Sequence, residues 1–329
     1  MSLFSALADF LKPAPPPDPA VLTALDRVVE MLGPQLRLAS HFEKRLAPAV
    51  QNALTYCDGL VAALPGPVDI SRQAFAADPL VHALFATADD IDQMLGRSQA
   101  VRDFLAEPCA WEGDHFYAMF AARRQYRRQF GMAQQGDVIR NDVPQMLLYF
   151  SGQTLIEPSC RLEVTLHGLR CKAFESLLHT FGAHVEALRR EREGLRTDAS
   201  IEHAHLTILR GTSGGDEFAV TTRHLAELSD RLRDNAESLT PDHLTGALAD
   251  YLQQPAAALR LSPVSLSVDR LGVVHDSANG NGDVQTINFP ELTARDRRLH
   301  LAMLARISRD EALAAVNRVR DRQHRFMII

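Results

Sequence analysis

Residues 161–210 carry an apolar stripe with helical spacing, and this stretch constrains the fold more than any other feature of the 329-residue chain. Most of its apolar residues recur every three or four positions, at Leu162, Leu166, Leu169, Phe174, Leu177, Phe181, Val185, Leu188 and Leu195. A helix of this length would extend about 70 Å, which is more than a compact domain needs. Because residues 186–198 are mostly charged, we expect this part of the helix to project into solvent.

A second helix is predicted directly after the first one. Residues 211–216 form a glycine-rich turn, and residues 217–237 again place apolar side chains at helical spacing. Two helices joined by such a short turn form an antiparallel helical hairpin, which we place at residues 161–238. Its apolar seam resembles a coiled coil and predicts self-association of the chain through Phe174, Leu177, Phe181, Leu188 and Leu195.

The whole chain is predicted to have an α+β fold that is mostly α. Residues 20–127 are expected to be a helical region, with one helix over 35–64 that Pro48 kinks or splits and another over 114–128. Residues 128–160 are expected to be a small antiparallel β region with a tight turn at Ser151-Gly152. Residues 239–329 are expected to be a C-terminal α/β segment packing on the body, with a strand preferred over 298–307 and a last helix that starts at Asp310.

The N-terminus combines an amphipathic helix at residues 1–12 with a proline-rich linker, PAPPPDP, at residues 13–19. The helix would gather five apolar side chains on one face, namely Leu3, Phe4, Leu7, Phe10 and Leu11. Such a tethered helix can dock on this chain, in the groove of a partner protein or on a membrane surface. The helix has no basic face, which disfavours the membrane. We therefore predict that it docks on protein and is dispensable for folding of the body.

Composition restricts the class of protein. Hydrophobic residues make up 46% of the chain and charged residues 23%, the balance of a soluble globular protein. No stretch has the pattern of a signal peptide or of a membrane-spanning helix, so a cytoplasmic protein is expected. The cysteines are widely spaced and form no CxxC pair, which predicts reduced thiols and neither a disulfide scaffold nor a zinc site; they are Cys57, Cys109, Cys160 and Cys171.

Searching for catalytic and metal-binding motifs gives only weak candidates. The signatures of dinucleotide-binding, P-loop, serine-hydrolase and zinc-protease sites are absent from the sequence. Three clusters could bind a metal but are better explained as a helix N-terminus, a hairpin loop and solvated histidines; they are Asp89 with Asp90 and Asp92, Asn279 with Asn281 and Asp283, and Glu202 with His203, His205 and His224. We therefore expect no metal and no cofactor.

The strongest concentration of positive charge is Arg123, Arg124, Arg127 and Arg128. On the helix predicted over 114–128 these arginines would cover one face. That face is a candidate anion-binding site for phosphate, RNA or an anionic lipid headgroup. The structural alternative is that the arginines complement the dipole at the C-terminal end of the helix and pair with neighbouring acids.

These observations favour a non-catalytic interaction or scaffold protein that works through the helical hairpin and the tethered N-terminal helix. Two alternatives stay open: an enzyme that acts on a phosphorylated substrate at a site assembled from separated residues, and a peripheral membrane protein. Whether the chain is an enzyme is left open, with the absence of motifs weighing against it. Another protein or a second copy is the expected partner, because the net charge of −6 argues against a nucleic acid.

Overall fold

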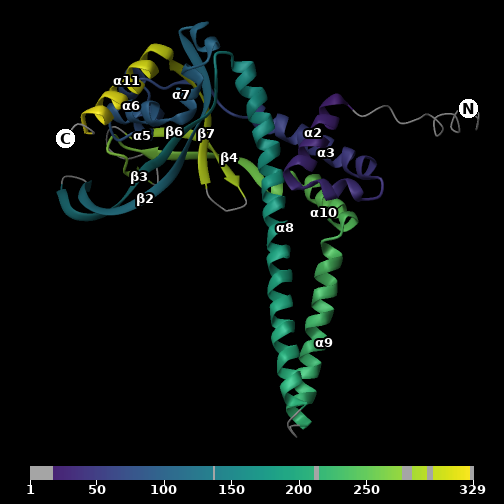
Figure 1. The fold of residues 1–329 in the computed structure, drawn as a ribbon. Coiled ribbons are helices and arrows are strands. Elements are labelled where there is room, and N and C mark those ends of the chain that lie inside the picture. Colours follow the sequence, from purple (N-terminus) through teal and green to yellow (C-terminus); the bar gives the residue numbers. More distant parts are fainter. Residues whose placement is uncertain (1–17, 136–137, 211–214, 276–283, 295–298, 327–329) are drawn as a thin grey trace, which may run out of the picture. The chain divides into compact units, whose positions relative to one another are not determined.

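A computed structural model describes residues 18–135, 138–210, 215–275, 284–294 and 299–326 (Figure 1). The predicted α+β fold with a mostly helical chain is confirmed. The chain divides into two compact units, each built from two separate stretches: unit 1 is Met1–Thr55 with Ser176–Pro255, and unit 2 is Tyr56–Glu175 with Ala256–Ile329. Within the described ranges, no helix is both long and apolar enough to cross a membrane.

Unit 1 is helical. It contains α2 (Pro19–Leu32), η1 (Pro34–Leu38), the start of α3 (Phe42–Ala62), most of α8 (Leu162–Leu209), α9 (Gly215–Ser238) and α10 (Pro241–Gln253). The Asp18 side chain caps α2 by accepting a hydrogen bond from the Ala20 amide, as its position before Pro19 suggests. Helix α3 begins later than predicted, at Phe42, and continues through Pro48 without being split.

Unit 2 is built on one curved sheet. Its strands are β1 (Val68–Asp69), β2 (His115–Gln135), β3 (Val138–Ser159), β4 (Leu259–Val268), β5 (Val274–His275), β6 (Gln285–Ala294) and β7 (Leu299–Ser308). The order is β3-β2-β7-β6-β4-β5, and all these pairings are antiparallel, while β1 pairs with β7 in parallel. An isolated bridge between Leu147 and Val273 links β3 to the residue before β5, so the two ends of the sheet curl toward each other.

Short helices cover the inner face of this sheet. They are α4 (Arg72–Ala77), α5 (Pro79–Leu84), α6 (Ala88–Arg97), α7 (Gln99–Leu105), η2 (Pro108–Trp111) and the C-terminal α11 (Arg309–Phe326), with η3 (Pro255–Ala257) leading into β4. Their apolar side chains join those of the strands in one core, in which Phe85 packs against Phe120 and Phe104 against Phe116. Helices α6 and α11 approach so closely that a Cβ at Gly96 would lie 2.6 Å from the Ala315 carbonyl oxygen.

The helix predicted over 114–128 is wrong, because these residues belong to strand β2. Alternate side chains of the segment, Phe116, Ala118, Phe120 and Ala122, are buried in the sheet core, which is the two-residue period of a strand. The long β2 strand therefore starts at His115, well before the expected boundary at 128, and the short β1 strand lies even earlier, inside the predicted helical region.

The tight turn predicted at Ser151-Gly152 is also wrong. Both residues lie inside β3, where Ser151 is paired with Arg123 and Thr154 with Ala121. Two residues of β3 thus face a single residue of β2, which is a β-bulge. Gly152 has a φ of +65° there, a left-handed conformation that glycine adopts without steric cost.

Several other predictions are confirmed. Helix α8 covers 48 residues, and α9 contacts it through the pairs His224 with Glu202 and Asn235 with Leu188, so the two helices form the predicted antiparallel hairpin (Figure 1). The preferred strand near 298–307 is β7, and the last helix is α11. Residues 1–12 and most of the linker at 13–19 lie outside the described residues.

Candidate functional site

The β2–β3 pair continues well beyond the rest of the sheet (Figure 1). The pairing of β2 with β7 ends at Arg123 and His300, whereas its pairing with β3 continues to Gln135 and Val138. We call residues 124–135 and 138–150 the arm. Inside the arm each strand is paired with the other in register from Arg124 with Phe150 onward, apart from one irregularity after Gly131. The arm is therefore a two-stranded ribbon that carries the predicted arginine cluster.

The strand separates the four arginines that a helix would have kept together. Side chains alternate between the two faces of a strand, so Arg124 and Arg128 share one face with Tyr126 and Phe130. Arg123 and Arg127 lie on the opposite face. The predicted single arginine face does not exist, because its i, i+1, i+4, i+5 spacing matches a helical period and not a period of two.

Arg124 has a structural role at the base of the arm. Its Nε lies 2.7 Å from Oε1 of Glu291, and its Nη2 donates a hydrogen bond to Oε2 at 3.0 Å. Its Nη1 also donates to the Tyr126 hydroxyl at 2.8 Å, and the guanidinium lies 5.3 Å from the centre of the Tyr126 ring. The Glu291 side chain is only 5% exposed. Its burial raises the pKa of the Glu291 carboxyl, and the charge of Arg124 opposes that rise.

The other three arginines point away from the core. Arg123, Arg127 and Arg128 are exposed, and within the described part of the chain no ion pair is recorded for them. From residue 123 to residue 149 the sequence holds five arginines against two aspartates, whereas the whole chain has a net charge of −6. The arm is therefore a local basic region on an acidic protein.

Exposed apolar side chains accompany this charge. Phe130 is 75% exposed and Met132 71%, and Tyr126 and Tyr149 are also exposed. Tyrosine, phenylalanine, methionine and arginine are the residue types enriched in protein interfaces. Tyr126 and Phe130 are noticeable in the sequence between and after the arginines, but the predicted helix ended at residue 128 and did not bring them together with Met132 and Tyr149. The alternation of buried residues from Phe116 to Ala122 was the signal that could have revealed a strand.

The opposite face of the arm is tied down by a small polar network. The Tyr149 hydroxyl donates to the Gln125 side-chain oxygen at 2.7 Å, and the Gln125 nitrogen donates to the Ser151 hydroxyl at 2.9 Å. These bonds connect β2 and β3 across the start of the arm. They hold the ribbon together where Arg123 and Arg127 emerge from it.

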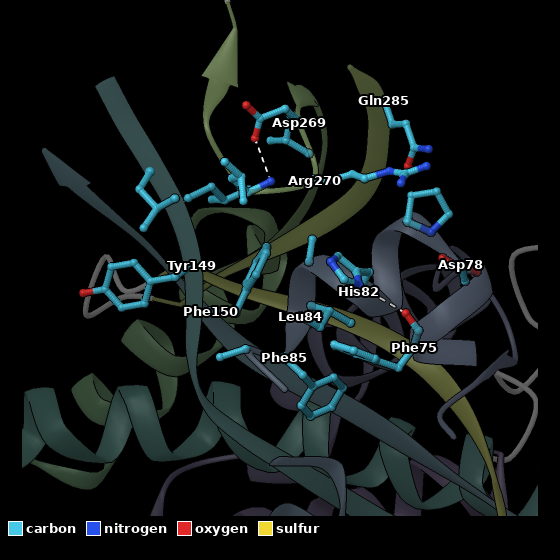
Figure 2. A pocket seen from close by; sticks show the side chains of 18 of the residues that line it. Phe75, Asp78, His82, Leu84, Phe85, Tyr149, Phe150, Asp269, Arg270 and Gln285 are labelled. Atoms are coloured by element: carbon cyan, nitrogen blue, oxygen red, sulfur yellow. Dashed lines mark hydrogen bonds between the residues drawn. The ribbon is translucent and has the colours of Figure 1, made fainter. Parts of the chain in front are cut away.

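A cavity of about 780 Å³ lies beside the base of the arm (Figure 2). Its walls come from α4, α5, β3 and the β4–β5 turn, and include Phe75, His82, Phe85, Phe150 and Arg270. This size is that of a small-molecule site. Its lining, however, is dominated by apolar side chains around the aromatic ring of Phe150.

The carboxylates at this cavity already serve the backbone. Asp78 caps α5 by accepting from the Leu80 and Val81 amides, and Asp269 accepts from the Leu271 and Val273 amides at 2.9 Å each. His82 shares a hydrogen bond with the Phe75 carbonyl (Figure 2). Asp269 also contacts a histidine, since its Oδ2 lies 3.3 Å from Nε2 of His275, but His275 does not line the cavity. The cavity can hold an apolar group.

The metal-binding candidates are explained by local contacts. Asp90 closes the capping box of α6 with Thr87, and both Asp89 and Asp92 contact Arg72. In the hairpin, His224 contacts Glu202 at 2.8 Å and does not meet His203. No group of three or more described histidine, cysteine, aspartate or glutamate residues could hold a metal ion. Asn279, Asn281 and Asp283 lie outside the described residues.

All four cysteines are free thiols. Cys57 is buried, and burial raises the pKa of its thiol to about 12. Burial also raises the pKa of the Cys109 thiol to about 11, helped by a contact with Glu107. A raised pKa keeps a thiol protonated and unreactive at neutral pH. Neither of these two cysteines has the environment of a catalytic nucleophile.

The predicted seam of the helical hairpin is buried within the chain. Phe174, Leu177, Phe181 and Leu195 are buried and Leu188 is half-buried. Because these side chains are already covered, the seam does not offer the surface that we predicted for self-association. Self-association itself stays a prediction. The large apolar residues that the described part of the hairpin does expose are Val164, Ile201, Ile208 and Val220, and only Val164 lies far from its tip.

The partner-docking candidates Leu3, Phe4, Leu7, Phe10 and Leu11 lie outside the described residues, so their docking stays a prediction. The sequence matches no protein-family model, no curated protein and no solved structure. The described residues define an α+β protein in which unit 1 holds a helical hairpin and unit 2 a two-stranded ribbon. No family is shown.

Proposed function

We propose that the chain is a non-catalytic, cytoplasmic interaction protein that binds a partner protein through the arm. The exposure of Phe130 and Met132 carries this proposal, because neither side chain contributes to a core. Large apolar side chains gain free energy when another surface covers them. Interface hot spots are enriched in tyrosine and arginine, both of which flank them here. The α8–α9 hairpin and residues 1–12 are proposed as additional contact elements.

Two further observations support this function. The net basic charge of the arm favours an acidic partner surface, since opposite charges steer association and fix orientation. The four free thiols suit a reducing compartment such as the cytoplasm. For the enzyme alternative, the arginines would need an acid–base pair beside them, and the described contacts of Arg124 serve Glu291 and Tyr126 instead.

The proposal is tested by removing the apolar side chains of the arm. Tagged wild-type protein and the double variant Tyr126→Ser/Phe130→Ser are purified from the cells that express the chain, and bound proteins are quantified by mass spectrometry. Leu38→Ser is the matched control, because Leu38 is 78% exposed and lies in unit 1.

We expect the arm variant to lose proteins that both the wild type and the control retain. If the arm variant retains every partner while deletion of residues 1–17 removes them, the N-terminal helix is the binding element and the arm is not.

A further inference from the structure

One backbone edge of the arm is open. Strand β2 lies between β3 and β7 up to Arg123, but beyond that residue the described chain pairs it only with β3. Alternate residues of the stretch from Arg124 to Met132 therefore direct their N–H and C=O groups away from β3, although the carbonyl of Met132, at its end, already accepts a hydrogen bond from the Gln145 side chain at 3.0 Å. Such an edge is a template for another strand, and natural proteins usually cover it or protect it with charge.

The arginines give this edge a definite charge preference. Arg127 and Arg128 are neighbours in β2, so their side chains emerge on opposite faces of the ribbon. A strand added here would meet a positive charge on whichever face its own acidic residues lie. Directly opposed unlike charges stabilise neighbouring strands, and like charges destabilise them.

The same charge argues against a second copy of this chain at this edge. Two β2 edges that pair about a twofold axis would bring Arg127 and Arg128 of one copy beside those of the other. The arginines thus protect the edge from self-pairing while leaving it open to an acidic strand. Charged residues on edge strands of other proteins prevent unwanted strand pairing in the same way.

We infer that the open edge of β2, from Arg124 to Met132, receives an extended acidic segment of a partner protein as an added strand. The main chain of that segment supplies hydrogen bonds, and its glutamates or aspartates lie on the face of Arg127, which is recognition by β-strand addition. On the face of Tyr126 and Phe130, alternate apolar residues of the segment would cover the exposed rings. The inference rests on the proposed function and names the partner of the same surface.

The test uses the full chain and a defined probe, a fluorescent ten-residue peptide in which glutamate alternates with valine. Binding is followed by fluorescence anisotropy at low salt. Arg127→Glu/Arg128→Glu is expected to weaken binding at least about tenfold, since the attraction between the peptide glutamates and Arg127 becomes repulsion. Arg37→Glu/Lys44→Glu makes the same charge change on exposed residues of unit 1 outside the hairpin and is expected to leave binding unchanged.

A second peptide separates strand addition from plain charge attraction. Methylation of the backbone nitrogens along its central six residues removes the amide donors and keeps the charge. We expect this peptide to bind at least about tenfold more weakly, because several main-chain hydrogen bonds are lost. Equal binding of the two peptides overturns the inference.

The remaining outcomes are equally decisive. If neither peptide binds, or if a single-stranded oligonucleotide binds in an Arg127- and Arg128-dependent way while the peptide does not, no acidic strand is added at this edge. The proposed function survives either result when partner capture still depends on Tyr126 and Phe130. If peptide binding does not depend on Arg127 and Arg128 and partner capture does not depend on Tyr126 and Phe130, both the inference and the proposed function are refuted.

Discussion

The arm and the α8–α9 hairpin are both pairs of antiparallel elements that follow each other in the sequence, but their apolar residues differ in exposure. In the hairpin, Leu195, Leu206 and Leu209 on α8 and Leu228 on α9 are buried. In the arm, Tyr126, Phe130 and Met132 are exposed. Two helices can turn one stripe each toward the other and close a seam between them. Two strands cannot, because cross-strand neighbours stand side by side on the same face of the ribbon.

This difference indicates which of the two hairpins needs a partner to cover its apolar residues. The apolar side chains of a helical seam bury each other within the chain. A two-stranded ribbon buries an apolar face only when a further layer or strand covers it. The rings of Tyr126 and Phe130 in the arm are thus available to a partner, whereas the apolar stripe of the hairpin is already buried.

The largest effect is expected at the base of the arm, where Arg124→Met removes the partner of Glu291. Leaving a buried carboxylate without its cation costs about 3–5 kcal/mol. Thermal and denaturant unfolding of the full chain at neutral pH measures this loss in the free energy of unfolding. A cost below about 1 kcal/mol would mean that Glu291 is solvated or neutral in the folded state.

The same variant has a predictable pH dependence. Burial already raises the pKa of Glu291 above its ordinary value of 4.5, so the folded state binds the proton more tightly than the unfolded state. Stability contributed by this group therefore falls as the pH rises from the unfolded pKa through the folded pKa. Removing Arg124 raises the folded pKa further. The deficit of Arg124→Met should be small near pH 4 and grow toward pH 7, and a deficit that does not change with pH contradicts this cause.

In the hairpin, Leu195→Ala should lower stability by about 2–4 kcal/mol, because it opens a cavity in a closed seam. Leu195 is only 4% exposed. Amide hydrogen exchange of α8 and α9 reports the loss locally. The exposed residue Ile201→Ala is the matched control on the same helix and should change little.

A smaller effect is expected for Asn235→Leu on α9. The Asn235 nitrogen donates to the Leu188 carbonyl at 3.1 Å, while its buried oxygen has no hydrogen-bond partner. The substitution loses one bond and removes one unsatisfied oxygen, so stability should stay within about 1 kcal/mol of the wild type. A loss well above that, measured by urea unfolding, would show that the asparagine fixes the pairing of the two helices.

The smallest effect on stability is predicted in the arm itself. Phe130→Ser should change the free energy of unfolding by less than about 0.5 kcal/mol, as for other surface positions. It should nevertheless weaken partner capture. A strongly destabilised Phe130→Ser protein would place this ring in a core and remove the contrast between the two hairpins.

The helical parts of the fold could be predicted from sequence because their signals are local. Asp18, Asp78 and Ser98 cap the helices that follow them, and the stripe of α8 repeats over many turns. Each signal depends on residues only a few positions apart. The length of the repeat also favoured the hairpin, since an apolar repeat with helical spacing over so many turns is typical of a long helix.

The arm could not be predicted in the same way. Residues 116–122 alternate with a period of two, but two of the four inward residues are alanines, which favour a helix. The arginine spacing also matched a helix. What makes β2 a strand is its pairing with β3 on one side and with β7, nearly 200 residues later, on the other. Such distant pairing overrides local propensity, and the short alternation from Phe116 to Ala122 is its only local signal.

The candidate site was therefore located only in part. The sequence singled out the arginines, with Tyr126 and Phe130 between and after them, but placed the arginines on one face of a helix and did not connect Met132 and Tyr149 with them. It also assigned self-association to a seam that the chain buries. In both cases the residues were noticed, but their exposure depends on which element each one packs against.

Hydrogen–deuterium exchange of the intact chain, with and without the alternating glutamate–valine peptide, tests the contrast between the two hairpins most directly. Without the peptide, the amides of residues 124–132 that face the open edge should exchange rapidly while those along α8 and α9 near Leu195 and Leu228 stay protected. With the peptide, protection should rise in residues 124–132 and stay unchanged in the hairpin. Strong, concentration-independent protection of residues 124–132 in the protein alone would contradict the account, because the edge would then already be covered.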